Sequence, residues 1–136
     1  MSFRDFRPTQ DWLEELCAKI SGVNKAPPEL SIIAVDPPRE LDGDSITLYF
    51  KFRNNKCIEA KLIQGKFYTK YTLSAKYNDL LKMLEGTLYP FAAVPLGKLK
   101  VERGSLGELA DYMPLAIEIV EAARDAARRR LSSQMR

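Results

Sequence analysis

The sequence predicts one α+β domain over residues 1–136, with a small β-sheet packed against helices. Three observations predict it. The length suits a single domain with a sizeable core. Hydrophobic residues make up 46% of the chain and charged residues 29%, which is typical of globular proteins. Apolar side chains recur with helical spacing near both ends of the chain, and with period two between residues 45 and 75.

The N-terminal part predicts a helix and then a short strand. Residues 9–22 carry apolar side chains at helical spacing, with Thr9 or Asp11 placed to cap the start and Gly22 to end the helix. Residues 30–36, LSIIAVD, are rich in β-branched side chains and precede two prolines. We expect this segment to form a first strand or an extended piece at a sheet edge.

A change of period between residues 45 and 75 predicts three strands. Residues 45–53, 57–63 and 66–74 each alternate apolar and polar side chains, and short turn-forming stretches separate them. Consecutive strands of this kind are expected to form an antiparallel meander with one face in water. The inward-facing candidates include Leu48, Phe50, Phe52, Leu62, Phe67 and Tyr71.

The second half predicts two helices around another strand. Helical spacing returns over residues 76–86 and ends at a glycine, and residues 97–103 alternate as a half-buried strand. Between them, residues 88–96 are apolar but interrupted by two prolines. An apolar stripe over residues 105–131 predicts a long helix, kinked or broken near Pro114 because a proline inside a helix costs roughly 3 kcal/mol.

The cysteine and histidine counts limit the chemistry. Cys17 and Cys57 lie far apart without the spacing of a disulfide framework, so we interpret them as separate packed thiols. The absence of histidine removes the commonest general base near neutral pH and the commonest metal ligand. We therefore expect no enzyme, no catalytic residue, no metal and no cofactor. A reaction that uses Cys57 or a carboxylate stays open as a weaker alternative.

Residues 77–104, YNDLLKMLEGTLYPFAAVPLGKLKVERG, carry an ordered set of short motifs at Asp79, Gly86, Leu88, Pro90, Gly97, Lys98, Leu99, Val101 and Gly104. This order resembles the central motif of the sterol carrier protein 2 (SCP2-type) lipid-transfer family. The resemblance implies a curved, mostly antiparallel five-stranded sheet over residues 30–104, covered on one face by helices, with an apolar tunnel between the layers. It also implies binding and transfer of a fatty acyl chain, an acyl-CoA, a sterol or an isoprenoid, without catalysis.

The same resemblance suggests which side chains line such a tunnel. Segment 88–96 is expected to gate its mouth, with a buried connection under the last helix as the alternative. Aromatic residues on the inner face of a sheet usually fill a packed core, and the sequence does not separate a core from a tunnel. The lining candidates are Leu48, Phe50, Phe52, Leu62, Phe67, Tyr71, Leu84, Phe91, Val94, Leu96, Leu99, Val101, Leu109, Met113 and Ile117.

The end of the long helix carries a cluster of basic residues that includes Arg124, Arg128, Arg129 and Arg130. One interpretation is a solvated helix end whose positive charge suits the helix dipole. Another is contact with an anionic membrane surface or a partner. Aromatic residues that could stack on bases are not interleaved with these arginines, so we expect no nucleic acid.

The function we expect is therefore a lipid carrier, whose partner is a lipid or another apolar small molecule and which contacts membranes transiently. The alternative is a non-enzymatic module that binds a partner, or forms a homodimer, through its long basic helix. No apolar run reaches membrane-spanning length, and the first ten residues lack the apolar core of a signal peptide. We expect a cytoplasmic protein.

Overall fold

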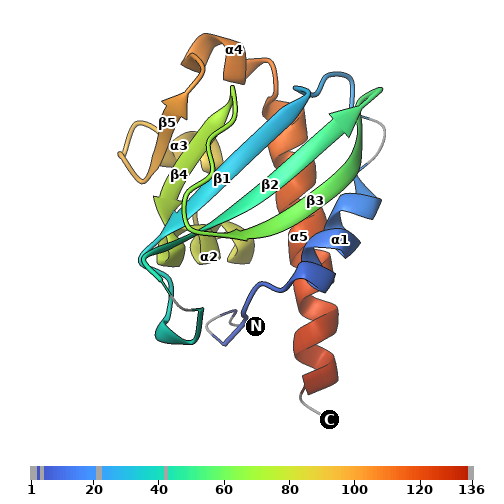
Figure 1. Ribbon diagram of the computed structural model, residues 1–136, viewed down its shortest axis with the longest axis vertical. Helices are drawn as coiled ribbons and strands as arrows, with labels where there is room; N and C mark the ends of the chain where they lie inside the picture. The colour runs from blue at the N-terminus through green and yellow to red at the C-terminus, as the bar shows by residue number, and fades with distance from the viewer. Residues whose placement is uncertain (1–2, 4, 21–22, 42, 135–136) are drawn as a thin grey trace.

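A computed structural model describes residues 3, 5–20, 23–41 and 43–134. It places a five-stranded β-sheet against a layer of helices on one face (Figure 1). In chain order the elements are α1 (Gln10–Lys19), β1 (Glu29–Val35), the 3₁₀ helix η1 (Arg39–Leu41), β2 (Ser45–Arg53), β3 (Lys56–Gln64), β4 (Thr72–Lys76), α2 (Tyr77–Glu85), α3 (Pro90–Ala93), β5 (Leu99–Arg103), α4 (Leu106–Ala110) and α5 (Met113–Gln134).

The sheet is built around two central strands, β1 and β4, that run in the same direction. Its strand order is β3-β2-β1-β4-β5. The β1–β4 pair is parallel, with Ser31 opposite Thr72, whereas the β1–β2, β2–β3 and β4–β5 pairs are antiparallel. The sheet is therefore mixed, and the expectation of a mostly antiparallel sheet is wrong.

The predicted three-strand meander ends after its second strand. β2 and β3 form the expected hairpin, but residues 65–71 then cross the outer face of the sheet instead of returning beside β3 (Figure 1). The Thr47 hydroxyl holds this crossing segment, because it donates to the carbonyl of Gly65 at 2.7 Å and accepts from the N–H of Phe67 at 3.0 Å. The crossing carries the chain to the far side of β1, where β4 joins in parallel.

The crossing segment also covers side chains that the alternation of β2 predicted to be in water. Thr47 is fully buried and Tyr49 is only 8% exposed. The ring of Tyr49 meets the ring of Phe67 edge-on, with centroids 5.6 Å apart. Phe67, predicted to point inward, therefore lies on the outer face of the sheet, where it is 42% exposed.

Helices α1 and α5 close one half of the inner face. Trp12 of α1 donates from its indole N–H to the carbonyl of Ala123 on α5 at 3.1 Å, and both residues are buried. Below them, Phe50 and Phe52 of β2 stack with centroids 6.2 Å apart in the same core cluster. Phe50 and Phe52 are buried in this half of the layer, whereas Trp12 and Ala123 lie where it borders a cavity.

The long C-terminal helix is broken where the sequence predicted a kink or break. α4 ends at Ala110, and α5 begins at Met113 and runs for 22 residues along the inner face and past the end of the sheet (Figure 1). Pro114 is the second residue of α5. A proline is tolerated there because the first N–H groups of a helix have no partner within it.

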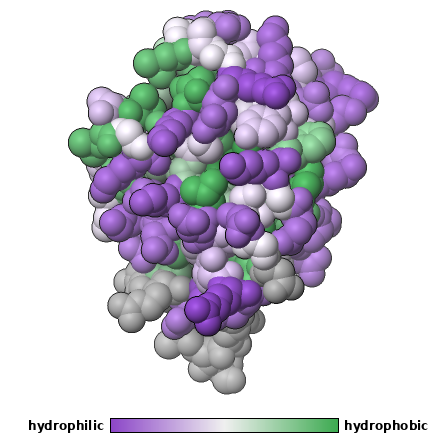
Figure 2. Space-filling model, turned by 60° about the vertical axis from the view of Figure 1, so that its left-hand side comes forward, coloured by the Kyte–Doolittle hydropathy of each residue, from purple (hydrophilic) through white to green (hydrophobic). Residues whose placement is uncertain are grey.

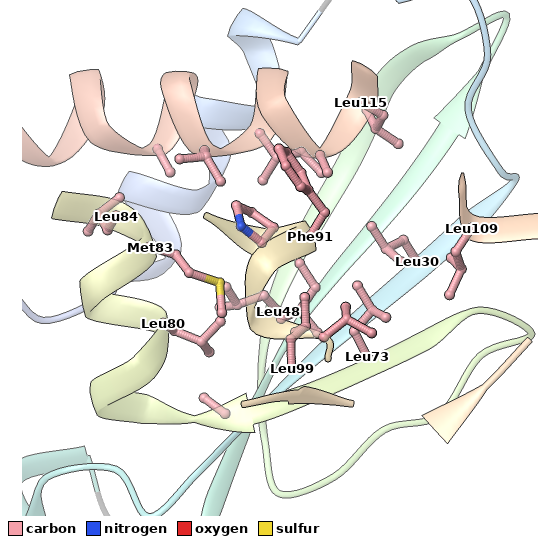
Figure 3. Close-up of a pocket in the computed structure, with 18 of the residues that line it drawn as sticks. Leu30, Leu48, Leu73, Leu80, Met83, Leu84, Phe91, Leu99, Leu109 and Leu115 are labelled. Atoms are coloured by element: carbon pink, nitrogen blue, oxygen red, sulfur yellow. The ribbon is translucent and has the colours of Figure 1, made fainter. Parts of the chain in front are cut away.

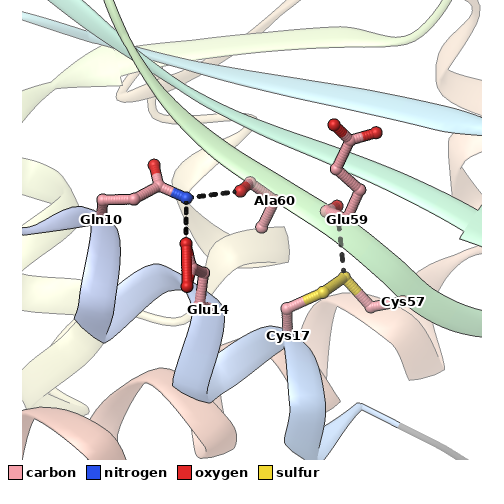
Figure 4. The surroundings of a disulfide bond; sticks show 6 residues. All are labelled: Gln10, Glu14, Cys17, Cys57, Glu59 and Ala60. Carbon is pink, nitrogen blue, oxygen red and sulfur yellow. Dashed lines mark hydrogen bonds between the residues drawn. A yellow bond between two sulfur atoms is a disulfide. The ribbon is translucent and has the colours of Figure 1, made fainter.

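A disulfide bond joins Cys17 of α1 to Cys57 at the start of β3 (Figure 4). The two Cα atoms are 5.3 Å apart, although the residues are 40 positions apart in the sequence. The interpretation of these cysteines as separate packed thiols is wrong. Their spacing in the sequence does not predict the disulfide, because α1 and β3 come together only in the tertiary fold.

Candidate functional site

The other half of the helix–sheet layer holds a cavity of about 400 Å³. Leu30 of β1, Leu48 of β2 and Leu73 of β4 line it from the sheet (Figure 3). Side chains of α2, among them Leu80, Met83 and Leu84, line it from one end, and Leu115 and its neighbours line it from α5. The cavity thus lies where α2, α3, α4 and α5 surround the inner face without filling it.

The lining is almost entirely apolar. None of the described residues that line the cavity is charged, and its three residues with a polar side-chain atom, Trp12, Tyr77 and Tyr112, are already bonded within the chain, Tyr112 to the Tyr71 hydroxyl. The Trp12 indole donates to the carbonyl of Ala123, and the Tyr77 hydroxyl donates to the carbonyl of Phe6 at 3.1 Å. Such a wall offers contact and exclusion of water, and no partner for a charged group.

The cavity opens between α3, α4 and the first turns of α5, where large apolar side chains are exposed. Phe91 lines the cavity and is still 53% exposed, and Leu106 lines it and is 58% exposed. Tyr89, Leu96 and Ile117 are further exposed residues on the same segments. Figure 2 shows hydrophobic residues gathered at the upper left of this view, on the side of the molecule that carries α3 and α4.

Two glycines of the motif over residues 77–104 shape the walls of this cavity. Gly86 ends α2 in a left-handed conformation, with φ at +91°, and turns the chain toward α3. Gly104 ends β5 with φ at +93°, and a β-carbon there would lie 2.8 Å from the ring of Tyr71. Between them, Leu99 and Val101 of β5 face the cavity. The motif therefore specifies backbone geometry and lining.

The predicted lining residues divide into two groups. Those that the structure places on the cavity wall are Leu48, Leu84, Phe91, Val94, Leu99, Val101, Leu109 and Met113. The others lie elsewhere. Phe50, Phe52, Leu62 and Tyr71 pack within the core, because other parts of the chain cover their part of the sheet. Phe67, Leu96 and Ile117 are exposed.

The largest omission of the sequence analysis is β1. Leu30, Ile32 and Ala34 alternate along this strand and all line the cavity. Residues 30–36 were expected to form a first strand or an extended piece at a sheet edge. The strand is confirmed, but it lies in the middle of the sheet. From α5 the candidates included Met113, which lines the wall, but not Leu115, Ala116, Ile119, Val120 and Ala123, which line it as well.

The arginines of α5 are largely engaged within the chain. Arg124 donates from Nε to the carbonyl of Leu84 on α2 at 2.7 Å. Arg130 donates to the Glu15 carboxylate on α1 at 2.6 Å, and Arg129 pairs with the same carboxylate. Arg128 is exposed. These contacts tie α5 to α1 and α2.

The charge of Glu15 reflects this arrangement. Burial raises the pKa of its carboxyl, but the hydrogen bond from Arg130 and the positive charges of Arg129, Arg130 and Lys19 lower it more, and the net direction is downward. The ionised carboxylate of Glu15 on α1 is therefore stabilised by the arginines of α5.

Over the described ranges, no helix is long and apolar enough to cross a membrane. The same residues contain no cluster of three or more Cys, Asp or Glu side chains placed to hold a metal ion.

Comparison with known proteins identifies the fold. No protein-family model matches the chain, and no curated protein matches it. A crystal structure of sterol carrier protein 2 aligns with a TM-score of 0.73 and 23% identity, over 85% of this chain and 95% of that one. The solution structure of a conserved hypothetical protein of Thermus thermophilus, described as possibly a sterol carrier protein, aligns with a TM-score of 0.73 and 24% identity, over 88% of each chain. The chain therefore has a sterol carrier protein 2-like fold, as the motif over residues 77–104 predicted.

Proposed function

We propose that the chain binds the hydrocarbon part of a lipid in the cavity, non-covalently and without catalysis. The observation that carries this proposal is a cavity of about 400 Å³ whose wall is almost entirely apolar and carries no charge among the described residues. At about 30 Å³ for a water-sized group, this volume suits roughly a dozen methylene groups. Each methylene removed from water contributes about 0.8 kcal/mol, before the cost of association is subtracted. The likeness to a sterol carrier protein structure supports the same function.

The lining also indicates which part of the lipid is held. No charged residue lies on the described wall, and a buried charge without a partner is costly. A carboxylate, phosphate or hydroxyl therefore stays at the mouth while the hydrocarbon occupies the interior. This arrangement suits fatty acyl and isoprenoid chains, including the acyl chain of an acyl-CoA, and makes no polar contact that would select a sterol. Segment 88–96, with exposed Phe91, then serves as the gate.

The alternative function, a module that binds through the long helix, needs a free apolar stripe on α5. In the structure this stripe packs against the rest of the chain. Ala126 and Ala127 are fully buried and Leu131 is 8% exposed. The burial of this stripe favours the lipid carrier over the homodimer or partner-binding module.

The proposal is tested by native mass spectrometry of the purified chain and by displacement of a fluorescent fatty acid. Ala116→Phe adds a ring to the cavity wall, and Ala18→Phe adds the same ring to the exposed side of α1. We expect saturable binding that Ala116→Phe weakens at least tenfold and Ala18→Phe leaves unchanged. Thermal unfolding of both variants verifies that they fold. Absence of co-purified lipid together with absence of saturable displacement would exclude the carrier.

A further inference from the structure

We propose that three aromatic residues, Phe6, Trp12 and Tyr77, form a fixed end wall that limits the length of the hydrocarbon chain in the cavity, and that Trp12 sets this limit. All three line the cavity, and each is 4% exposed. The inference rests on the proposed function, because it concerns the lipid that the cavity holds. It narrows the ligand class to chains of medium length, with roughly a dozen carbons between the mouth and the end wall.

The end wall lies away from the mouth, further along α5. Figure 3 shows Leu109 of α4 and Leu115 of α5 at one end of the cavity, and Leu84 of α2 at the other. The mouth is at the first end, where Leu106 is 58% exposed. Ala123, which contacts the end wall, lies ten residues after the start of α5, which corresponds to about 15 Å along the helix. A chain whose polar group stays at the mouth therefore meets the end wall with its tail.

Hydrogen bonds hold the end wall in place. The indole N–H of Trp12 donates to the carbonyl of Ala123 at 3.1 Å, and the hydroxyl of Tyr77 donates to the carbonyl of Phe6 at 3.1 Å. The rings of Phe6 and Trp12 meet edge-on, with centroids 5.0 Å apart. A hydrocarbon chain that pushed these rings aside would leave a buried donor without a partner, which is costly. The end wall is therefore expected to stop the chain instead of yielding to it.

The contact between α1 and α5 beyond Trp12 leaves no room for a longer chain. Leu13 and Leu16 of α1 are at most 1% exposed, and Ala126 and Ala127 of α5 are fully buried. These residues belong to the same core cluster as Trp12, and they do not line the cavity. The disulfide from α1 to β3 also restrains α1. Only a smaller side chain at the end wall itself would lengthen the cavity in this direction.

Met83 of α2 is the competing candidate for the residue that limits chain length. It lines the cavity and is 5% exposed, but it packs in a separate small cluster with Ala75, Ala93 and Leu99. A methionine side chain is flexible and adapts to the shape of its neighbours. Met83 is therefore expected to adjust to the width of a bound chain, whereas the bonded ring of Trp12 limits its length.

The experiment is displacement of a fluorescent fatty acid by a series of saturated fatty acids with eight to eighteen carbons, each below its critical micelle concentration. For the original chain, affinity should rise about fourfold per added methylene and level off at roughly a dozen carbons. Trp12→Leu should move this break to longer chains, so that a fatty acid two carbons beyond the original break binds about tenfold more tightly than it does to the original chain. Ala123→Leu, which adds a side chain in front of the end wall, should move the break to shorter chains.

Phe52→Leu is the matched control, because it also removes a buried ring, which is 6% exposed and does not line the cavity. A general loss of stability weakens binding of all chain lengths alike, so the break should stay in place in this variant. Thermal unfolding verifies that all variants fold.

The position of the break separates this proposal from the proposed function. Affinity that rises through eighteen carbons without levelling, or a break that Trp12→Leu leaves in place, would overturn the end wall while lipid binding stands. A break that moves in Met83→Ala but not in Trp12→Leu would assign the limit to α2 and overturn the proposal as well. Failure of every fatty acid in the series to displace the probe would overturn the proposed function, and the end wall with it.

Discussion

The side-chain amide of Gln10 bonds to the backbone of β3 at Ala60, as a neighbouring strand would. Its Nε2 donates to the carbonyl of Ala60 at 2.8 Å (Figure 4). Its Oε1 accepts from the N–H of Leu62 at 2.8 Å. β3 is an edge strand of the sheet. Exposed edges invite pairing with another chain, and proteins commonly cover them. Gln10 satisfies part of this edge and docks α1 on it.

Gln10→Ala is expected to lower the free energy of unfolding by about 2 kcal/mol, since two hydrogen bonds to backbone groups are lost. It also exposes the edge of β3, so size-exclusion chromatography should show association that increases with concentration. Glu14→Ala is the control. Glu14 accepts a hydrogen bond from the side-chain amide of Gln10, and its removal leaves both bonds from Gln10 to β3 in place. Equal stability of the Gln10→Ala variant and the original chain in urea unfolding would contradict this role.

The disulfide between Cys17 and Cys57 is expected to stabilise the fold by closing a loop of about 40 residues. In the chain-entropy view a loop of this length contributes about 4 kcal/mol. A reducing agent should therefore lower the thermal midpoint of the original chain substantially. The double variant Cys17→Ala, Cys57→Ala should unfold at the lower midpoint with or without reductant. If reductant leaves the original chain unaffected, the two thiols are not paired in solution.

Local patterns in the sequence predict the helices and the hairpin well, because spacing, caps and turns act over a few residues. Thr9 illustrates this: its side chain accepts from the N–H of Trp12 and caps α1, one of the two caps that the sequence offered. The break before Pro114 follows equally from local chemistry.

Strand order and sidedness could not be predicted in the same way. Residues 66–74 alternate like a strand, yet the strand observed there is Thr72–Lys76, because the preceding residues cross the sheet and cover Thr47 and Tyr49. Alternation reports that one side of a segment is buried, and does not report which neighbour buries it. The pairing of Cys17 with Cys57 was missed for the same reason.

The cavity was predictable in kind but only partly in its residues. Phe50 and Leu48 lie on one face of β2, so the alternation of the strand predicts the same inward position for both. In the structure Leu48 lines the cavity, whereas Phe50 is fully buried in the core cluster that includes Trp12. The difference depends on where α1 and α5 end over the sheet, which is a property of the assembled layers.

The carboxylate of Glu15 is expected to make the stability of the domain depend on acid pH. Its pKa is lowered in the folded state, so its contribution is fully present above the ordinary carboxyl value of 4.5 and is lost as the pH falls through the lowered folded-state pKa. Glu15→Gln should therefore cost about 1 kcal/mol at neutral pH, the upper end for partly exposed ion pairs, and almost nothing in strong acid.

Urea unfolding of Glu15→Gln, Arg130→Gln and the double variant as a function of pH checks this expectation. The coupling energy between the two positions should be favourable at neutral pH and should shrink as the carboxylate is protonated. A coupling that stays constant down to strong acid would show that Glu15 acts by packing instead of by charge.

Gly104 and Gly97 form a matched pair that tests the geometry of the motif. Both have positive φ values, +93° and +73°, but only at Gly104 does an added β-carbon meet a neighbour, the Tyr71 ring at 2.8 Å. Gly97→Ala should cost about 1 kcal/mol through backbone strain alone, and Gly104→Ala should cost more, because Tyr71 must also move. Equal losses in urea unfolding would mean that the Tyr71 contact imposes no constraint.

Trp12 offers a direct test of where a hydrocarbon chain sits, because it is the only tryptophan in the sequence and it lines the cavity. Its side chain is 4% exposed, so a quencher in bulk water reaches it poorly. A fatty acid brominated along its chain should quench Trp12 fluorescence only when the chain lies inside the cavity, since quenching by bromine requires contact. The same fatty acid without bromine should compete and restore the emission. Ala116→Phe should reduce the quenching, whereas Leu96→Gln, which changes an exposed side chain outside the cavity wall, should not. Quenching that survives Ala116→Phe but disappears in Leu96→Gln would place the bound chain on the outer surface and remove the cavity as its site.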